Sequence, residues 1–211
     1  MIASDVTRQP RGGRGARERI LQAAAQLFYR HGIHATGVAA LTEAAHVSTR
    51  TFYQHFPTKN ALVEAYLHHY DVDAPIAPEQ QLLRDDLPPA KRLLAIFDPL
   101  EAQQTPVVRG CPFHNAAVEA AGDIPDVAGL VERHKQAFRT RLTEIAAAAG
   151  AADPQSLGKQ LAVVYEGATA LSTSCNDTQV IADARRAAAT LIDTALQTRP
   201  TTRRAPRAAR R

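Results

Sequence analysis

The sequence predicts an all-α protein of about nine helices, with a small N-terminal domain followed by a larger C-terminal one. Aromatic residues make up only 5% of the chain and alanine is used heavily, which favours helices over sheets. Apolar residues recur at spacings of three and four, and no segment shows the alternation of a β-strand. With 211 residues, 45% of them hydrophobic, the chain is long enough to bury a sizeable core.

The N-terminal part of the chain predicts three short helices separated by tight turns. The first begins near Ala16 and ends at Gly32, because glycine suits the C-terminal cap of a helix. The second opens at Gly37, and the third follows Ser48, a residue type that caps helix N-termini. The third helix ends before Pro57 and is too short to be stable alone, so it must pack against its neighbours.

The rest of the chain predicts further helices and one stretch without a clear pattern. Thr58 caps a fourth helix, and residues 71–89 contain four prolines with room for one short helix between Glu79 and Asp85. Asp153 followed by proline is a strong helix start. The other expected helices span residues 91–104, 114–121, 125–149, 154–175 and 177–197.

Charge is segregated along the chain. Residues 1–60 hold eight Lys and Arg against three Asp and Glu, whereas residues 61–198 hold eleven against eighteen. Residues 199–211 hold six Arg and no acid. Basic ends around an acidic middle suggest that the ends meet a polyanion. For the C-terminal tail, the alternative that it only keeps the protein soluble stays open.

Several classes of protein are disfavoured. Two cysteines far apart in sequence form no disulfide framework and fit a reducing cytoplasm. No apolar run is long enough to span a bilayer, and the N-terminus lacks the apolar region of a signal peptide. There is no phosphate-binding glycine loop, HExxH motif or nucleophile elbow. We therefore expect a cytoplasmic protein that is not an enzyme and has no cofactor.

The third predicted helix offers a polar outer face, made of Thr49, Arg50, Thr51, Tyr53, Gln54 and His55. Arginine can donate to the paired acceptors of guanine in the major groove, and Tyr53 and His55 are placed for phosphate oxygens. Lys59 stands at the start of the next helix, where backbone amides favour an anion. Apolar spacing alone leaves an ordinary surface helix as the alternative.

This region resembles the DNA-binding domain of the TetR/AcrR family of transcriptional regulators. The resemblance rests on RERIL, on LF, on Gly32 with ATGV, and on VSTRTFYQHFPTKNAL. It implies a third helix that enters the major groove and a dimer that binds a palindromic operator. The residues implied to contact DNA are Thr36, Ser48, Thr49, Arg50, Thr51, Tyr53, His55 and Lys59, with Thr36 on a backbone phosphate.

Three positions depart from the family pattern. His46 stands where the family usually has glycine, so we expect it to adopt a positive φ, which histidine tolerates better than most residues. Arg50 replaces a residue that is usually small and is expected to add a base contact. Asn60 replaces the usual acidic residue, so the start of the fourth helix is expected to be less well stabilised.

The segment RGCPFHNAAVE resembles a subgroup of the family with a Gly-Cys-Pro segment in its ligand-binding domain. The resemblance implies helices that wall a ligand cavity, with ligand binding moving the fourth helix and spreading the two recognition helices. The expected cavity residues are Phe97, Leu100, Cys111, Phe113, His114, Val118, His134, Phe138 and Tyr165. For the apolar residues the alternative is plain core, and for the histidines it is satisfaction by backbone groups.

Cys111 allows two interpretations. It follows Arg109 and precedes a helix N-terminus, both of which can lower a thiol pKa and favour sensing of oxidants or electrophiles. The simpler interpretation is a small buried hydrophobe. Cys111 and His114 also have a ligand-like spacing, but without two further ligands nearby we expect no metal site.

The last two predicted helices carry small and apolar residues that could pair with a second copy of the chain. Such pairing would give a four-helix interface with two-fold symmetry, as a palindromic operator requires. The alternative is that both helices are buried within one subunit. The residues concerned are Leu161, Val164, Tyr165, Ala168, Leu171, Ala184, Ala188, Leu191, Ile192 and Ala195.

The sequence therefore predicts a ligand-responsive repressor that binds a palindromic operator as a homodimer and is released by a small-molecule inducer. We expect a disordered basic arm over 1–15, a DNA-binding domain over 16–60 with its helix-turn-helix motif at about 37–56, a ligand-binding and dimerisation domain over 61–198, and a disordered tail over 199–211. The alternative is an architectural nucleic-acid binder with little sequence preference and a steep salt dependence.

Overall fold

The computed structural model describes residues 13–102, 109–120, 122 and 124–197. These residues form eleven α-helices and one π-helical segment, without any strand, so the predicted all-helical class is confirmed. None of the described helices is both long and apolar enough to cross a bilayer. Helix α1 already begins at Gly13, inside the arm predicted over residues 1–15, and the rest of that arm and the tail lie outside the described residues.

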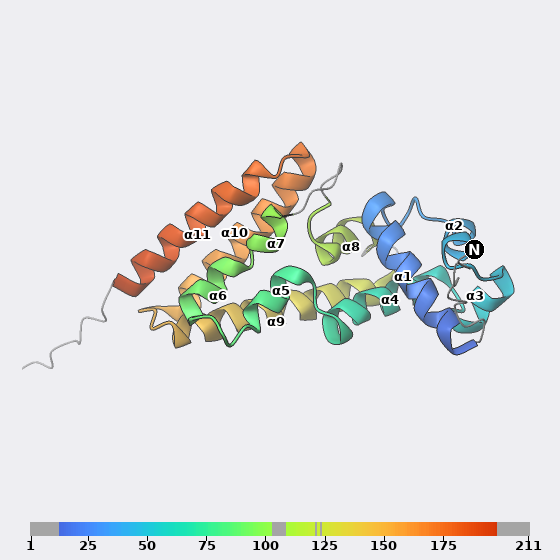
Figure 1. Ribbon diagram of the computed structural model, residues 1–211, viewed down its shortest axis with the longest axis horizontal. Coiled ribbons are helices and arrows are strands. Elements are labelled where there is room, and N and C mark those ends of the chain that lie inside the picture. Colours follow the sequence, from blue (N-terminus) through green and yellow to red (C-terminus); the bar gives the residue numbers. More distant parts are fainter. Residues whose placement is uncertain (1–12, 103–108, 121, 123, 198–211) are drawn as a thin grey trace, which may run out of the picture. The chain divides into compact units, whose positions relative to one another are not determined.

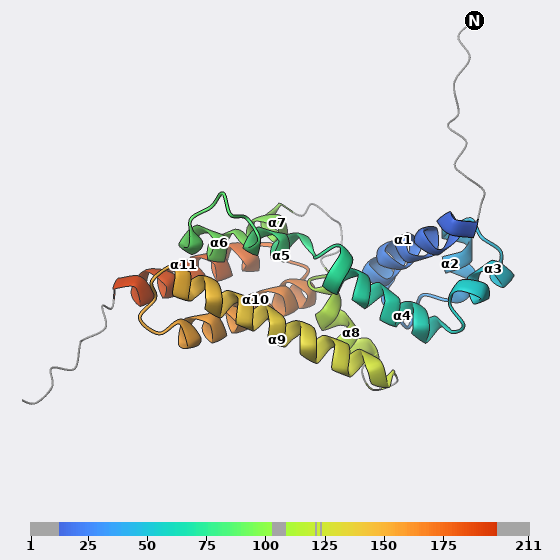
Figure 2. The same ribbon diagram turned by 90° about the horizontal axis from the view of Figure 1, so that it is seen from below.

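The chain divides into two compact units, and the first is built around α1. In Figures 1 and 2, α2 and α3 lie beside α1, and α4 runs alongside it. Its elements are α1 (Gly13–His31), α2 (Val38–Ala44), α3 (Thr49–His55), α4 (Lys59–His68), the π-helical segment η1 (His69–Asp73), α8 (Pro112–Ala120) and the first part of α9 (Pro125–Ala148).

The predicted caps set the ends of the N-terminal helices. Gly32 closes α1 with a φ of +88°, and its N–H donates to the Phe28 carbonyl at 2.9 Å. The Ser48 hydroxyl accepts from the Thr51 N–H at 3.0 Å, and the Thr58 hydroxyl accepts from the Ala61 N–H at 3.0 Å. Each cap satisfies a backbone group that the helix itself leaves open.

The first unit is larger than the predicted DNA-binding segment 16–60, because α8 shares its core. Cys111, Phe113 and Ala116 are buried in the same apolar cluster as Phe28 of α1 and Leu67 of α4. A segment distant in sequence therefore completes the packing around the N-terminal helices.

The second unit contains three short helices, the second part of α9 and a pair of long helices. Its elements are α5 (Ala77–Leu82), α6 (Pro89–Ala95), α7 (Asp98–Glu101), the rest of α9, α10 (Pro154–Cys175) and α11 (Gln179–Gln197). The helix predicted over 91–104 is divided into α6 and α7. Pro99 explains the break, because a proline inside a helix lacks the N–H for its bond and clashes with the carbonyl four residues earlier.

Helices α10 and α11 lie side by side in Figure 1 and make an extensive helix–helix contact. The predicted start of α10 is confirmed: the Asp153 carboxylate accepts from the Ser156 N–H at 3.0 Å, and Pro154 is the first helical residue. Helix α10 also approaches α9 closely at Gly158. A Cβ added there would lie 2.9 Å from the backbone nitrogen of Thr143 and 3.0 Å from its Cα.

Replacing Gly158 by alanine is expected to lower the free energy of unfolding by about 1–3 kcal/mol, because the α9 backbone cannot yield without moving the helix. Gly129→Ala is the matched control. A Cβ there would meet only a terminal nitrogen of the flexible Arg133 side chain, so the change should be neutral or stabilising by up to about 1 kcal/mol. Urea unfolding followed by circular dichroism measures the stability of both variants. Equal effects of the two substitutions would contradict the close approach of α10 to α9 at Gly158.

Candidate nucleic-acid interface

Helix α3 is held by its apolar side and presents its polar side to solvent. Phe52 is fully buried in the core of the first unit, and Phe56 is buried directly after the helix ends. On the opposite face Thr49, Arg50, Tyr53 and Gln54 are exposed, with 48% of Tyr53 accessible. This is the arrangement that a recognition helix requires, because base edges can be reached only by side chains that the core does not use.

The turn between α2 and α3 has the geometry expected from its sequence. His46 adopts a φ of +51°, as predicted for the position where glycine is usual. The Val47 N–H donates to the Thr42 carbonyl at 3.0 Å and closes the turn. Histidine therefore accepts a backbone conformation that most side chains avoid.

Two arginines of α1 fix the helix-turn-helix to the body of the unit. Arg19 Nε donates to the Ala45 carbonyl at 3.0 Å, at the C-terminal end of α2. The Arg17 guanidinium lies 5.4 Å from the centroid of the Phe56 ring, within the range of a cation–π interaction. Two of the basic residues near the N-terminus therefore hold the helix-turn-helix in place through contacts within the protein.

The remaining predicted contact residues are partly engaged within the protein. The Ser48 and Thr51 hydroxyls are 2.8 Å apart and share a hydrogen bond, and Thr51 and His55 are half-buried. Lys59 Nζ donates to the His34 carbonyl at 3.4 Å. Partial burial lowers the pKa of Lys59, and the nearby carboxylate of Glu119 opposes that shift. The described contacts leave the Thr49, Arg50, Tyr53 and Gln54 face as the most accessible part of the predicted site.

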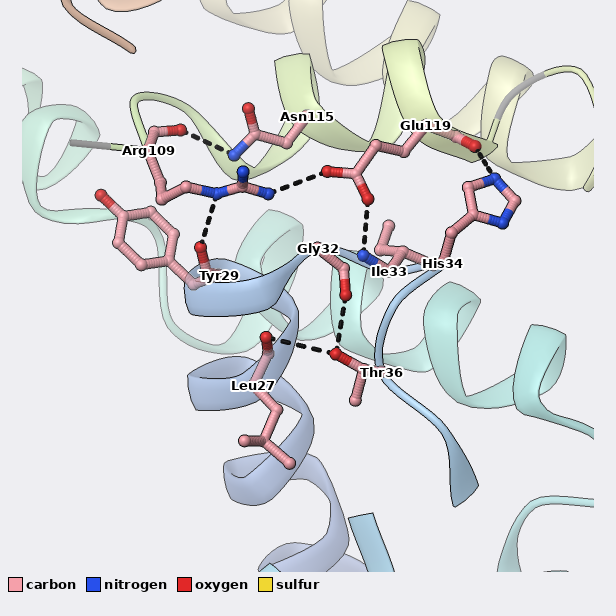
Figure 3. A network of polar contacts seen from close by, with 9 residues as sticks. All are labelled: Leu27, Tyr29, Gly32, Ile33, His34, Thr36, Arg109, Asn115 and Glu119. Carbon is pink, nitrogen blue, oxygen red and sulfur yellow. Dashed lines mark hydrogen bonds and ion pairs between the residues drawn. The ribbon is translucent and has the colours of Figure 1, made fainter. Parts of the chain in front are cut away.

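The prediction that the Thr36 side chain reaches a phosphate is not supported by the structure. Thr36 is 3% exposed, and its hydroxyl donates to the Gly32 carbonyl at 2.7 Å, with the Leu27 carbonyl at 3.3 Å (Figure 3). The hydroxyl is therefore engaged with carbonyls at the C-terminal end of α1 and in the turn that follows it. Gln54, which the sequence placed on the outer face but not among the contacts, has the exposure that Thr36 lacks.

Comparison with known proteins covers both units. The model of bacterial regulatory proteins of the tetR family matches residues 20–66, and the model of the tetracyclin repressor-like C-terminal domain matches residues 89–188. The HTH-type transcriptional repressor ComR of Escherichia coli K12 is 30% identical over 149 residues, which cover 66% of this chain and 70% of ComR. The chain belongs to the tetR family.

Two solved structures agree with this assignment. The sav143 protein of Streptomyces avermitilis is 33% identical, with a TM-score of 0.70 over 85% of this chain and 97% of that chain. The TetR-family regulator SCO4454 of Streptomyces coelicolor is 27% identical, with a TM-score of 0.75 over 87% of this chain and 97% of that chain. As a tetR-family protein, the chain is a helix-turn-helix transcriptional regulator rather than an enzyme.

The residues predicted to line a ligand cavity are divided between the two units. Phe97, Phe138 and Tyr165 are buried together in the second, with the Tyr165 ring centroid 6.1 Å from Phe97 and 5.0 Å from Phe138, and Leu100 packs against this core. Cys111, Phe113 and His134 belong to the first unit. There the His134 ring stacks on Phe113, and its Nδ1 shares a hydrogen bond of 2.9 Å with the Asp71 carboxylate.

Two other predicted cavity residues are less buried. His114 is half-buried, whereas Val118 is 74% exposed on α8, a position that the wall of an enclosed cavity would not have. Glu119 and Ala120 follow it at the end of the helix, and Ala120 is the buried residue there. The helical rotation from Val118 to Ala120 therefore turns the valine outward.

Cys111 is 2% exposed, and Lys135 Nζ donates to its sulfur at 3.3 Å. The burial agrees with the small-hydrophobe interpretation of this residue, and the ammonium adds a polar contact that the sequence did not indicate. Among the described residues, no three His, Cys, Asp or Glu side chains gather in a way that could hold a metal ion.

The turn at His46 gives a direct test of the interface geometry. His46→Val is expected to lower the free energy of unfolding by about 1 kcal/mol or more, because a β-branched residue is strained at positive φ. His46→Gly should leave it unchanged or raise it, since glycine adopts this conformation freely. Urea unfolding measures the stability of both variants. A valine variant as stable as the glycine variant would show that the turn has another conformation.

Proposed function

We propose that this tetR-family regulator is a repressor that binds a palindromic operator as a homodimer, with α3 in the major groove, and is released by a small-molecule inducer. The observation that carries the proposal is the polar face of α3, where four adjacent side chains are accessible while Phe52 anchors the opposite face. ComR, with 30% identity, is named as a repressor, which supports the same mode of action here.

Recognition of the base sequence is assigned to Arg50 and also to Tyr53, which the sequence placed at phosphate oxygens but which is exposed on the same face as Arg50. Phosphate contacts are assigned to the positions around them. An exposed arginine near the start of α3 can donate two hydrogen bonds to guanine, and one such pair contributes about 1–3 kcal/mol of discrimination against the wrong base. Thr49 and Gln54 flank this pair, whereas Ser48, Thr51, His55 and Lys59 are suited to backbone oxygens.

Dimerisation is proposed through α10, and of the α10 residues predicted for this interface it keeps Leu171 but not those that are buried. Leu161, Tyr165 and Ala168 are buried in the subunit's own core, as are Ala188 and Ile192 of α11. Val163 is 72% and Leu171 51% exposed, and their spacing of eight residues places them on one face of α10 with Gly167 between them. Two such faces can pack around a two-fold axis.

The proposed inducer site uses the aromatic cluster of the second unit. Phe97, Phe138 and Tyr165 are supplied by three separate segments, so a ligand that enters among them would change how α9 and α10 pack. All three residues lie within residues 89–188, the region matched by the C-terminal domain model.

Replacing Arg50 and Tyr53 together by alanine is expected to weaken binding to duplexes selected by the wild-type protein from a random pool, by about tenfold or more. Binding to a scrambled duplex should change much less, because phosphate contacts persist. Arg139→Ala removes the same charge from an exposed position on α9 outside the helix-turn-helix and is the control. Fluorescence anisotropy measures the affinities of the wild type and both variants for the two duplexes, and equal losses of the double variant on both duplexes would favour an architectural binder.

Leu171→Arg is expected to shift the protein from dimer to monomer, because it places a charge in the proposed apolar contact. Leu83→Arg is the matched control, since Leu83 has the same 51% exposure in the same compact unit but lies outside α10. Light scattering at micromolar concentration reports both masses. A wild-type monomer, or a dimer that survives Leu171→Arg, would contradict this interface.

A further inference from the structure

The turn between α1 and α2 is held from outside the helix-turn-helix by one carboxylate. Glu119, near the end of α8, accepts the Ile33 N–H on Oε2 at 2.6 Å (Figure 3). Its backbone carbonyl also bonds with the His34 ring. The two partners are consecutive residues directly after the end of α1, and they lie more than eighty positions from Glu119 in the sequence.

Arg109 fixes that carboxylate and the end of α1 together. Its Nη2 donates to Glu119 Oε1 at 2.9 Å, and its Nε donates to the Tyr29 carbonyl in the last turn of α1 at 2.9 Å. The Arg109 carbonyl in turn accepts from Asn115 Nδ2 at 2.6 Å. An arginine at this end of a helix complements both its open carbonyls and its dipole.

The carboxylate comes close to the backbone of the turn. A Cβ added to Gly32 would lie 2.6 Å from Glu119 Oε2 and would displace the carboxylate, and the φ of +88° independently favours glycine. The carboxylate thus lies directly against the backbone. We call the contacts of Arg109 and Glu119 with Tyr29, Ile33 and His34 the clasp.

The clasp acts on the segment that leads into the interface. Two residues after His34 comes Thr36, whose hydroxyl bonds back to Gly32, and α2 starts at Val38. The His34 carbonyl accepts from Lys59 at the start of α4. The same short turn is therefore bonded to α1, α4 and α8, and it leads directly into α2.

We propose that Glu119, oriented by Arg109, is a positioning residue for DNA recognition, although it lies outside the helix-turn-helix. The inference rests on the proposed function, because it assumes that the α3 face binds DNA. Glu119 fixes the α1–α2 turn, and the turn keeps α2 and α3 in the orientation that fits the major groove. Without the clasp, the orientation of α2 and α3 varies, and the affinity for the operator falls.

The sign of the effect separates this role from simple electrostatics. Removing a carboxylate makes the protein more basic, which by itself strengthens binding to DNA of any sequence. A positioning role requires the opposite for the operator, because specific contacts need a defined geometry whereas phosphate attraction does not. Glu119→Ala must therefore weaken specific binding even though it removes a negative charge.

The experiment compares Glu119→Ala, Glu119→Gln and Glu132→Ala on a duplex selected by the wild-type protein and on a scrambled duplex. Glu132 is exposed on α9 in the same unit, so its removal changes the charge equally without touching the turn. We expect Glu119→Ala to lose roughly tenfold in affinity for the selected duplex. Glu119→Gln keeps an oxygen to accept the Ile33 N–H and should lose less, and Glu132→Ala should lose nothing.

Amide hydrogen exchange supplies a second readout without DNA. Faster exchange at residues 33–37 in Glu119→Ala, with helical circular dichroism retained, is expected. If Glu119→Ala loses its circular dichroism, Glu119→Gln takes its place, and a loss confined to the selected duplex still supports the clasp. If both Glu119 variants kept wild-type affinity, or lost equally on both duplexes, the role of Glu119 would be refuted while the proposed function would stand. A wild-type protein that selects no duplex would refute the proposed function and this inference with it.

Discussion

Burial of Phe52 is the constraint on which the interface depends. A helix of seven residues forms too few internal hydrogen bonds to persist alone, so α3 requires tertiary contacts. Phe52 provides them by filling the core shared by α1, α2 and α4, a burial that contributes roughly 1.5–3 kcal/mol. Because one side of α3 is fixed in this way, the opposite side is also fixed, and Arg50 and Tyr53 face outward as a consequence.

The support for α3 comes in layers that extend beyond the helix-turn-helix. Arg17 and Arg19 attach the motif to α1, and the clasp attaches the end of α1 to α8. A total charge count treats these arginines and Arg50 alike, yet Arg17 and Arg19 contact the protein itself whereas Arg50 lies on the exposed face of α3.

Local chemistry explains which features the sequence predicted. The helix cap at Ser48 and the positive φ of His46 depend on residues next to them in the sequence, so a few neighbouring positions were enough to predict both. Exposure depends on packing partners distant in sequence. The sequence could not show that Thr36 would cap α1 from within, that Val118 would face solvent, or that Tyr165 would be core rather than interface. No pattern in the sequence indicated the clasp, because Arg109 and Glu119 are far in sequence from Tyr29, Ile33 and His34 and meet them only in the folded protein.

Amide hydrogen exchange of the wild-type protein with and without a selected duplex tests the central claim most directly. If the polar face of α3 reads DNA, exchange should slow across residues 48–59, with the largest protection in α3, and the rest of the first unit should change little. A selected duplex that leaves those residues unprotected, while slowing exchange elsewhere in the chain, would contradict the assignment of α3 as the recognition helix.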